Sequence, residues 1–343
     1  MRLVGQTESN EFELTVPPDD IIFGHSEVMR ALQKTVEPIA GVELPVLIYG
    51  ETGTGKEVLA HYIHRHSLRN NGPLVKISCA AIPASLLEAE LFGYEEGAFT
   101  GAYCTKPGLV EQANNGTLLL DQIAELDVTI QAKLLQLLQD GSFTRIGGQQ
   151  EIKIDTRVIC IANRNLRDDI AQGRFRLDLF HRINGASFRI PELRERPEDI
   201  PAIAGYLIGL FNQTFGTDAW PLSPAMYRRL QQYRWPGNVR ELENVLRRYV
   251  VMGSPEAIAE DLARRSLAFP PTELPVHRSL PLKVRTQRLV REVETQAILR
   301  VLHLNNWNRR KSAQMLKISY RALLYKIRRA GIGEYCPPKS ANS

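Results

Sequence analysis

The chain has 343 residues, of which 43% are apolar and 24% charged, so it is long enough for two or three domains and has the composition of an ordinary soluble protein. No apolar run is long enough to cross a bilayer and the N-terminus lacks a basic-then-apolar signal, so we expect a cytoplasmic protein. Residues 281–332 carry a net charge of +11 whereas residues 1–280 carry −6, and such a basic C-terminal unit suggests binding to a nucleic-acid phosphate backbone.

Short apolar runs alternate with longer helical patterns through the first half of the chain. The four runs are residues 46–49, 74–77, 117–120 and 158–161. Their largely apolar character is typical of buried strands, and the helical stretches between them imply βα units and a parallel sheet. The pattern therefore predicts an α/β fold with a parallel sheet.

The second half of the chain looks helical. Residues 191–252 show helical patterning, interrupted at Trp235-Pro236-Gly237-Asn238, and a short helix is predicted near residues 257–265, ahead of four prolines. Further on, apolar residues recur every four positions from Leu289 to Val301, which marks one face of a helix. The predicted segments are a tail at 1–19, the α/β unit at 20–190, a helical unit at 191–252, a linker at 253–284, a basic helical domain at 285–332 and a tail at 333–343.

A glycine-rich stretch follows the first predicted strand and opens a helix. It reads Gly50-Glu51-Thr52-Gly53-Thr54-Gly55-Lys56-Glu57, which has the spacing of a P-loop. Its glycines allow backbone N–H groups to curl around phosphates, and the helix N-terminus adds a favourable potential. Lys56 is expected to reach the β- and γ-phosphates of ATP. Glu57 stands where a P-loop usually has a Ser or Thr that binds the metal.

A second nucleotide motif lies at the end of the third predicted strand. The strand runs into Asp121, which fits the acid that holds Mg²⁺ through water. The next position normally carries a glutamate that polarises the attacking water, but here it is Gln122. An amide has the right shape for this role but cannot take up a proton.

One loop identifies a family. The sequence Gly97-Ala98-Phe99-Thr100-Gly101-Ala102 resembles the signature of sigma-54-dependent activators, also called bacterial enhancer-binding proteins, which are AAA+ ATPases. The resemblance spans about residues 20–332, and its further motifs are Glu90-Leu91-Phe92-Gly93, Phe175-Arg176-Leu177-Asp178-Leu179, Leu193-Arg194-Glu195-Arg196 and Trp235-Pro236-Gly237-Asn238-Val239-Arg240-Glu241-Leu242. It implies an AAA+ P-loop domain with a helical lid, followed by a small all-α helix-turn-helix domain. A general AAA+ chaperone or chelatase is disfavoured by the loop and the basic C-terminal domain.

The resemblance assigns partners to the loop and to two arginines. The Phe99-Thr100 tip, with the whole stretch from Gly97 to Ala102, is expected to contact sigma-54 RNA polymerase, since flanking glycines give mobility and an exposed Phe gives an apolar anchor. A second loop near residues 145–148 resembles the one that supports it. Arg176 and Arg182 match arginine fingers that reach the γ-phosphate held by a neighbouring subunit, which implies a hexameric ring.

The resemblance also completes the nucleotide site. Arg240 matches the lid arginine that senses nucleotide, and Phe23 with Gly24 matches the segment beside the adenine. Asn163 directly follows the position that reads the γ-phosphate in the family, and it is also expected to bind nucleotide. The expected cofactors are ATP and Mg²⁺, the latter held by Asp121 through water.

Three departures from the family pattern surround one phosphate. Gln122 replaces the catalytic glutamate, Ser78 replaces an asparagine that holds this glutamate inactive, and Ala162 replaces a threonine that reads the γ-phosphate. Loss of a general base costs on the order of 100- to 10,000-fold in rate, so we expect slow hydrolysis by a ring of this chain alone. Glu125 could substitute, but this position in the family commonly carries an acid already.

Two interpretations of this altered site stay open. The chain works beside a competent related activator in a mixed ring, donating its arginine fingers, or it uses ATP binding alone as an assembly switch in a DNA-binding regulator. About 20 residues precede the motor, too few for a receiver or sensor domain, so regulation by a protein in trans is expected.

The basic C-terminal domain resembles a Fis-type helix-turn-helix. Residues 305–316 form a turn and a short helix, and residues 320–330 a second helix that is expected to enter the major groove of double-stranded DNA, as a dimer on a two-fold site. The expected base or groove contacts are Ser319, Tyr320, Arg321 and Tyr325. The expected phosphate contacts are Arg310, Lys311, Lys326 and Arg328.

Overall fold

The computed structural model describes residues 16–254 and, further on, residues 258, 262, 298, 301, 302, 305, 308–316 and 318–329. The chain divides into two compact units, Met1–Ala268 and Phe269–Ser343. Most of the helix predicted near 257–265 and most of the apolar repeat from Leu289 to Val301 lie outside the described residues.

Five parallel strands form the central sheet of the first unit, in the order β2-β5-β8-β1-β9. Their bounds are β1 Val46–Tyr49, β2 Leu74–Ser78, β5 Thr117–Asp121, β8 Arg157–Ala162 and β9 Ala186–Arg189. The first four coincide with the predicted apolar runs. The fifth was not predicted, because β9 reads Ala-Ser-Phe-Arg and has Phe188 as its one large apolar residue, too few to form an apolar run. The predicted α/β parallel sheet is confirmed.

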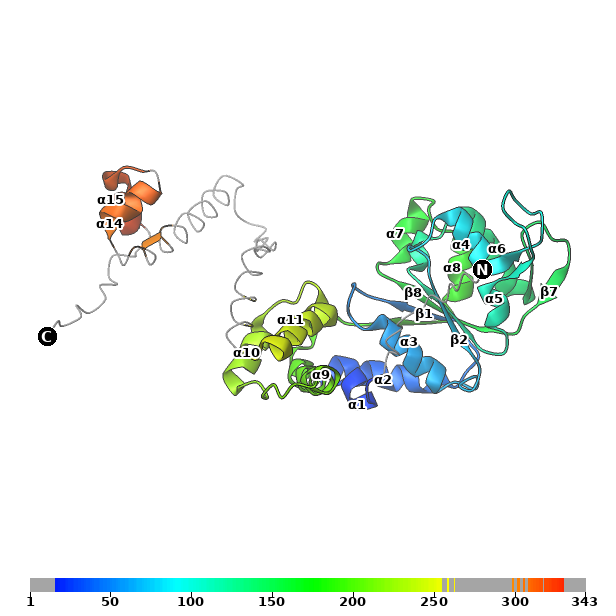
Figure 1. Ribbon diagram of the computed structural model, residues 1–343, viewed down its shortest axis with the longest axis horizontal. Coiled ribbons are helices and arrows are strands. Elements are labelled where there is room, and N and C mark those ends of the chain that lie inside the picture. The colour runs from blue at the N-terminus through cyan, green and yellow to red at the C-terminus, as the bar shows by residue number, and fades with distance from the viewer. Residues whose placement is uncertain are drawn as a thin grey trace, which may run out of the picture. The chain divides into compact units, whose positions relative to one another are not determined.

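Alternate residues of the inner strands pack on opposite faces of the sheet, as the two-residue period of a strand requires. Leu118 and Leu120 join the core beneath one group of helices, whereas Leu119 joins the core beneath the other. Figure 1 shows α1, α2 and α3 on one face, with α4, α6 and α8 on the other. The helices of this unit are α1 Asp19–Phe23, α2 Glu27–Ala40, α3 Lys56–Arg65, α4 Ala84–Phe92, α5 Leu109–Gln112, η1 Ile123–Glu125, α6 Val128–Asp140, α7 Leu166–Ala171 and α8 Leu177–Ile183.

Two short antiparallel ladders project from the sheet domain. One pairs β3 Gly93–Tyr94 with β4 Lys106–Pro107, and the other pairs β6 Ser142–Thr144 with β7 Glu151–Lys153. An isolated bridge joins Tyr94 to Ile146, so the loops that the two ladders carry lie against each other.

A helical lid follows the sheet and packs around one buried tryptophan. It comprises η2 Leu193–Glu195, η3 Pro197–Asp199, α9 Ile200–Phe215, α10 Pro224–Gln232 and α11 Asn238–Met252. Trp235 is fully buried in the lid core and its indole N–H donates to the carbonyl of Leu230 at 2.8 Å. The break predicted at Trp235-Pro236-Gly237-Asn238 is the turn between α10 and α11.

Among the described residues of the second unit, two helices have defined bounds, α14 Arg309–Met315 and α15 Tyr320–Arg329. Each helix starts at a polar cap: the Asn308 side chain accepts from the backbone N–H of Lys311 at 3.2 Å, and Ser319 Oγ accepts from that of Ala322 at 3.1 Å. Ala313, Leu323 and Ile327 form a small core with Ile298 and Leu302. In the part of the chain that the structure describes, no helix is long and apolar enough to cross a membrane.

Candidate nucleotide site and partner-binding surfaces

The P-loop connects β1 to α3 and is curled around its own lysine. Gly53 and Gly55 have φ angles of +82° and +101°, which a residue with a side chain rarely adopts. Lys56 Nζ donates to the carbonyls of Gly50 at 2.8 Å and Glu51 at 2.7 Å. Burial lowers the pKa of Lys56 to about 8, while Asp121 opposes this shift. The arrangement places a cation and turn N–H groups where phosphates are expected.

The lid is bound directly to the P-loop. The Asn238 amide N–H₂ donates to the Glu51 carboxylate and to the Thr52 carbonyl, both at 3.1 Å, and its oxygen accepts from the backbone N–H of Leu193 at 2.9 Å. The carbonyl of Gly53 accepts from the backbone N–H of Val239 at 2.9 Å. A Cβ on Gly53 would collide with the Gly237 carbonyl, so this close approach requires glycine.

A second set of contacts comes from the start of the lid, where Arg196 lies between η2 and η3. Arg196 Nη2 donates to the carbonyl of Thr54 at 2.9 Å. Asp199, which is fully buried, accepts from the backbone N–H groups of His25 at 2.6 Å and Ser26 at 2.8 Å, and from Ser26 Oγ at 2.7 Å. The same short segment therefore holds both the P-loop and the residues that follow α1.

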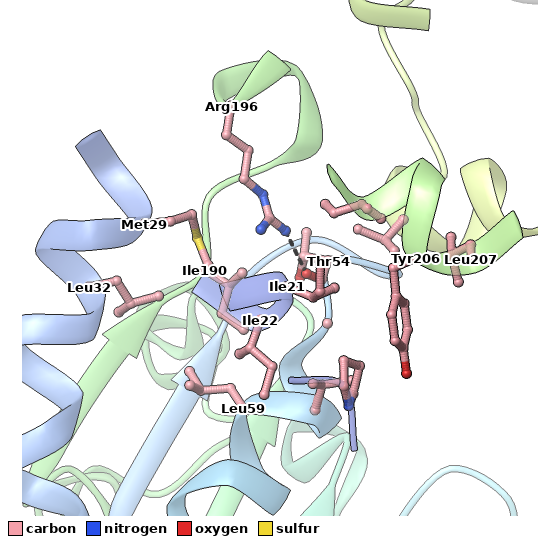
Figure 2. A pocket seen from close by; sticks show the side chains of 15 residues that line it. Ile21, Ile22, Met29, Leu32, Thr54, Leu59, Ile190, Arg196, Tyr206 and Leu207 are labelled. Atoms are coloured by element: carbon pink, nitrogen blue, oxygen red, sulfur yellow. Dashed lines mark hydrogen bonds between the residues drawn. The ribbon is translucent and has the colours of Figure 1, made fainter. Parts of the chain in front are cut away.

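An apolar cavity lies between the P-loop, the N-terminal helices and the lid (Figure 2). Its lining is mostly aliphatic and includes Ile21, Ile22, Leu59, Ile190 and Leu207. The Phe23 side chain is buried in the sheet core, with its ring edge-on to Tyr62 at 4.9 Å between centroids. The cavity is thus lined by Ile21 and Ile22, which directly precede the predicted adenine segment, whereas the Phe23 side chain packs in the sheet core. Gly24 has no room for a Cβ because the Asp199 carboxyl group lies against it.

The opposite end of the site contains the predicted water-activating residues. Asp121 ends β5 and Ser78 ends the adjacent β2, in register. Gln122 has a left-handed φ of +59° and its amide nitrogen donates to Ser78 Oγ at 3.4 Å. Ala162 is fully buried at the end of β8. Two of the three departures from the family pattern, Gln122 and Ser78, thus contact each other. Ser78 and Ala162 end strands of the same sheet, and Gln122 directly follows the end of β5.

Two other acids, Glu57 and Glu125, form ion pairs with cations of this chain. Glu57 accepts a hydrogen bond from Lys76 Nζ, and its pKa is lowered to about 2 by His61 and Lys76. Glu125 forms an ion pair with Arg164 at 2.9 Å. Both carboxylates therefore already face cations of this chain.

Arg240 and Asn163 lie at the edges of the P-loop. The backbone N–H of Arg240 donates to Gly53 at 3.3 Å, while its side chain is exposed. Asn163 lines an open pocket together with Gly50 and Glu51. Both predicted positions adjoin the P-loop.

The two predicted fingers lie on and just before α8. Arg176 is half-buried and pairs with Asp178 at 2.7 Å, while Arg182 Nε donates to the Leu138 carbonyl at 2.8 Å. Between them, Leu177 is 54% exposed. Fully buried Gln131 anchors this segment: its Oε1 accepts from the backbone N–H of Arg176 at 2.9 Å, and its Nε2 donates to the carbonyls of Leu126 and Arg174 at 2.8 and 2.9 Å.

The loop from Gly97 to Ala102 is closed at its base and supported by its neighbour. The backbone N–H of Gly97 donates to the Ala102 carbonyl at 2.9 Å. Phe99 is 44% exposed and its ring lies edge-on to Tyr94, with 5.0 Å between centroids. Arg145 of the second loop donates to Glu95 at 2.9 Å and to Glu111 at 2.7 Å. Gly101 and Thr100 form the open tip, where no atom lies within 4 Å of a Cβ built on Gly101.

The predicted DNA contacts gather on two helices of the second unit. Arg310 and Lys311 are exposed on α14, and Ser319, Tyr320, Arg321 and Tyr325 are exposed at the cap and on α15. Lys326 is half-buried, and the Arg328 side chain lies outside the described residues, although its backbone belongs to α15. Ser319 also caps α15, which gives it a structural role that its spacing alone indicated only in part.

Sequence reasoning gave no role to Arg196, Asp199, Gln131 or Asn238, although each is a buried polar side chain at the site. Arg196 and Asn238 stand in motifs that supported the family resemblance. A polar residue inside an otherwise apolar pattern was the available signal, but the sequence does not reveal which backbone groups it would contact.

Comparisons with known proteins agree along the whole chain. Residues 22–189 match the Sigma-54 interaction domain, residues 194–273 the AAA+ ATPase lid domain, and residues 289–329 the Fis family of bacterial regulatory proteins. The Regulatory protein AtoC of Escherichia coli (strain K12) is 44% identical over 313 residues, covering 91% of this chain and 68% of AtoC. The Response regulator protein PilR of Pseudomonas aeruginosa is 38% identical over 317 residues, covering 92% of this chain and 71% of PilR.

Solved structures give the same result. The crystal structure of NtrX from Brucella abortus in complex with ATP superposes with a TM-score of 0.66 at 32% identity, covering 90% of this chain and 69% of that one. Its complex with ADP gives a TM-score of 0.67 at 30% identity, with the same coverage. The fold and the order of its parts are therefore those of the matched proteins.

Proposed function

Because this chain belongs to the sigma-54-dependent transcriptional regulators, with an AAA+ lid and a Fis-type DNA-binding domain, we propose that it is an activator subunit that binds ATP but hydrolyses it slowly on its own. One observation carries the proposal: beside a well-formed phosphate cradle, the side chain at the water-activating position is an amide that donates to Ser78.

The site fits ATP with Mg²⁺. The phosphates would lie against the P-loop N–H groups and Lys56, with the base in the apolar cavity. The solved complexes of NtrX with ADP and with ATP support nucleotide binding by this fold. No cluster of three His, Cys, Asp or Glu side chains occurs within the described ranges, so phosphates and waters beside Asp121 would supply the ligands of Mg²⁺. Bound there, Mg²⁺ neutralises phosphate charge.

Slow hydrolysis follows from what Gln122 can do with a water molecule. Its amide oxygen accepts a hydrogen bond and so can orient a water, but the amide cannot accept the proton that water must lose. Glu57 and Glu125 are each paired with a cation of this chain. Ala162 offers no hydroxyl group for the γ-phosphate. The chain therefore retains the groups for binding and lacks those for turnover.

Ring assembly is supported by the exposed finger segment. Leu177 is exposed and the adjacent Arg176 is half-buried, so this short stretch offers an apolar contact and a charge to a neighbouring subunit. Arg182 would join them on the same neighbour. In a mixed ring, these arginines would complete the site of a related activator that has the glutamate. In a ring of this chain alone, ATP binding would act as an assembly switch for a DNA-bound regulator.

The remaining partners are sigma-54 RNA polymerase and upstream DNA. A mobile, glycine-flanked loop that presents Phe99 suits an apolar recess on sigma-54. The exposed basic and tyrosine side chains of α14 and α15 suit a major groove and its flanking phosphates.

Capture of sigma-54 by the purified full chain tests this function. With ATPγS present, we expect a complex detectable by native gel electrophoresis, and we expect Phe99→Ala to weaken it about 100-fold through loss of the central apolar contact. Leu68→Ala is the matched control, because Leu68 is an exposed apolar residue on a different loop. Equal capture by all three proteins, or capture without nucleotide, would contradict the proposal.

A further inference from the structure

Arg196 is a buried cation in a cavity with a mostly apolar lining. Its side chain extends from the start of the lid and ends beside the P-loop, near Ile190 and Ile21 (Figure 2). It is only 3% exposed. Removing a guanidinium group from water costs several kcal/mol unless strong partners replace the lost hydration. A side chain in this position therefore requires good hydrogen-bond acceptors.

The described residues supply few of them. A guanidinium group has five N–H donors and no acceptor. Nη2 donates to the Thr54 carbonyl at 2.9 Å, while Nε is buried and has no hydrogen-bond partner among the residues that the structure describes. The nearest acid, Asp199, directs both carboxylate oxygens at His25 and Ser26 instead.

A comparison with Arg157 shows what a purely structural arginine looks like in this molecule. Arg157 is equally buried, and its Nε also lacks a partner within the described residues. Its two terminal nitrogens, however, donate to the carbonyls of Ala40 and Ile39, at the C-terminus of α2. A helix C-terminus favours a cation. Arg196, by contrast, donates to the one carbonyl of Thr54 and lines a cavity, not the C-terminus of a helix.

We propose that Arg196 recognises the nucleoside part of the bound nucleotide by donating a hydrogen bond to an acceptor atom of its base or ribose. The inference rests on the proposed ATP site. A guanidinium group can only donate, so the matching ligand atom is an acceptor, such as a purine ring nitrogen or a ribose oxygen. Through Thr54, the same side chain connects recognition of the nucleoside to the phosphate cradle.

Calorimetric titration of two ligands separates this role from a structural one. ADP contains phosphates and a nucleoside, whereas tripolyphosphate contains phosphates only. Arg196→Gln is expected to weaken ADP binding about 10- to 100-fold, as loss of one charge-assisted hydrogen bond does, and to leave tripolyphosphate binding within twofold of the unchanged chain. Arg247→Gln, at an exposed lid arginine paired with Glu243, is the control and should change neither affinity.

Analogues then identify the acceptor. The unchanged chain should bind one of 7-deaza-ADP, 2′-deoxy-ADP and 3′-deoxy-ADP about as weakly as Arg196→Gln binds ADP, and Arg196→Gln should weaken that analogue no further. If Arg196→Gln does not fold, Arg196→Lys, which keeps the charge, is titrated with the same two ligands. Its affinity for ADP should again fall more than its affinity for tripolyphosphate.

Equal weakening of ADP and tripolyphosphate would overturn the inference, because Arg196 would then act only on the shape of the P-loop. Failure of the unchanged chain to bind either ligand would instead overturn the proposed nucleotide site, and the inference with it.

Discussion

The two ends of the nucleotide site differ in how firmly they are built. At the P-loop end, Asn238, Arg196 and Gly53 tie the cradle to the lid through several hydrogen bonds of 2.9 to 3.1 Å. At the water-activating end, the predicted residues share one contact of 3.4 Å between Gln122 and Ser78. We therefore expect binding and turnover to depend on different residues, so that one can weaken while the other persists.

The largest effect is expected from a substitution that changes the water-activating end and leaves the P-loop end as it is. Gln122→Glu restores a group that can accept a proton, and we expect phosphate release to rise on the order of 100- to 10,000-fold. ADP affinity should stay within about threefold, since the P-loop contacts are unchanged. Phosphate release is measured under saturating ATP. The control is Gln33→Glu, the same change of side chain at an exposed contact on α2.

If Gln122→Glu alone gives no increase, the triple variant with Ser78→Asn and Ala162→Thr should give it. Failure of both would place the defect elsewhere than at these residues and contradict the account of the water-activating end.

A glycine substitution tests the firmness of the P-loop end. Gly53→Ala adds a Cβ at a φ of +82°, where it would also collide with the carbonyl of Gly237 in the lid. Such backbone strain costs about 1 to 3 kcal/mol, so ADP affinity should fall roughly 5- to 150-fold. Gly205→Ala, with open space around its Cβ, should leave affinity unchanged when both variants are titrated with ADP. Unaltered affinity in Gly53→Ala would mean that the lid does not need this close approach.

The cradle should also respond to pH through its lysine. Burial lowers the pKa of Lys56 to about 8, so its charge is lost as pH rises above that value. ADP affinity should fall by up to tenfold per pH unit above pH 8 and be flat just below it, whereas Lys56→Arg should show no such slope. Because the unfolded lysine titrates near 10.5, the free energy of unfolding should rise between about pH 8 and 10.5.

The smallest expected effect concerns a substitute base. Glu125 is held in an ion pair with Arg164 on the protein surface. Glu125→Gln should therefore change residual phosphate release by less than about twofold, measured beside the unchanged chain. A loss on the order of 100-fold would show that Glu125 takes the proton in place of Gln122.

Much of this molecule follows from its sequence. Apolar runs predicted the three inner strands and the edge strand β2, because buried strands are rich in apolar residues, but the other edge strand, β9, has only Phe188 to bury and was not predicted. The P-loop, Asp121 and the loop from Gly97 to Ala102 were found because their chemistry requires fixed spacings. Arg196, Asp199 and Asn238 were missed because their roles arise from contacts between segments that are far apart in the chain.

ATP is expected to remain unhydrolysed while it is bound to this protein. The most direct measurement is to incubate the purified chain with an equal amount of ATP and Mg²⁺, isolate the bound nucleotide after successive intervals and identify it by chromatography. We predict that the bound nucleotide is ATP from the unchanged chain and ADP from Gln122→Glu over the same intervals. Recovery of ADP from both proteins at the same rate would contradict the claim.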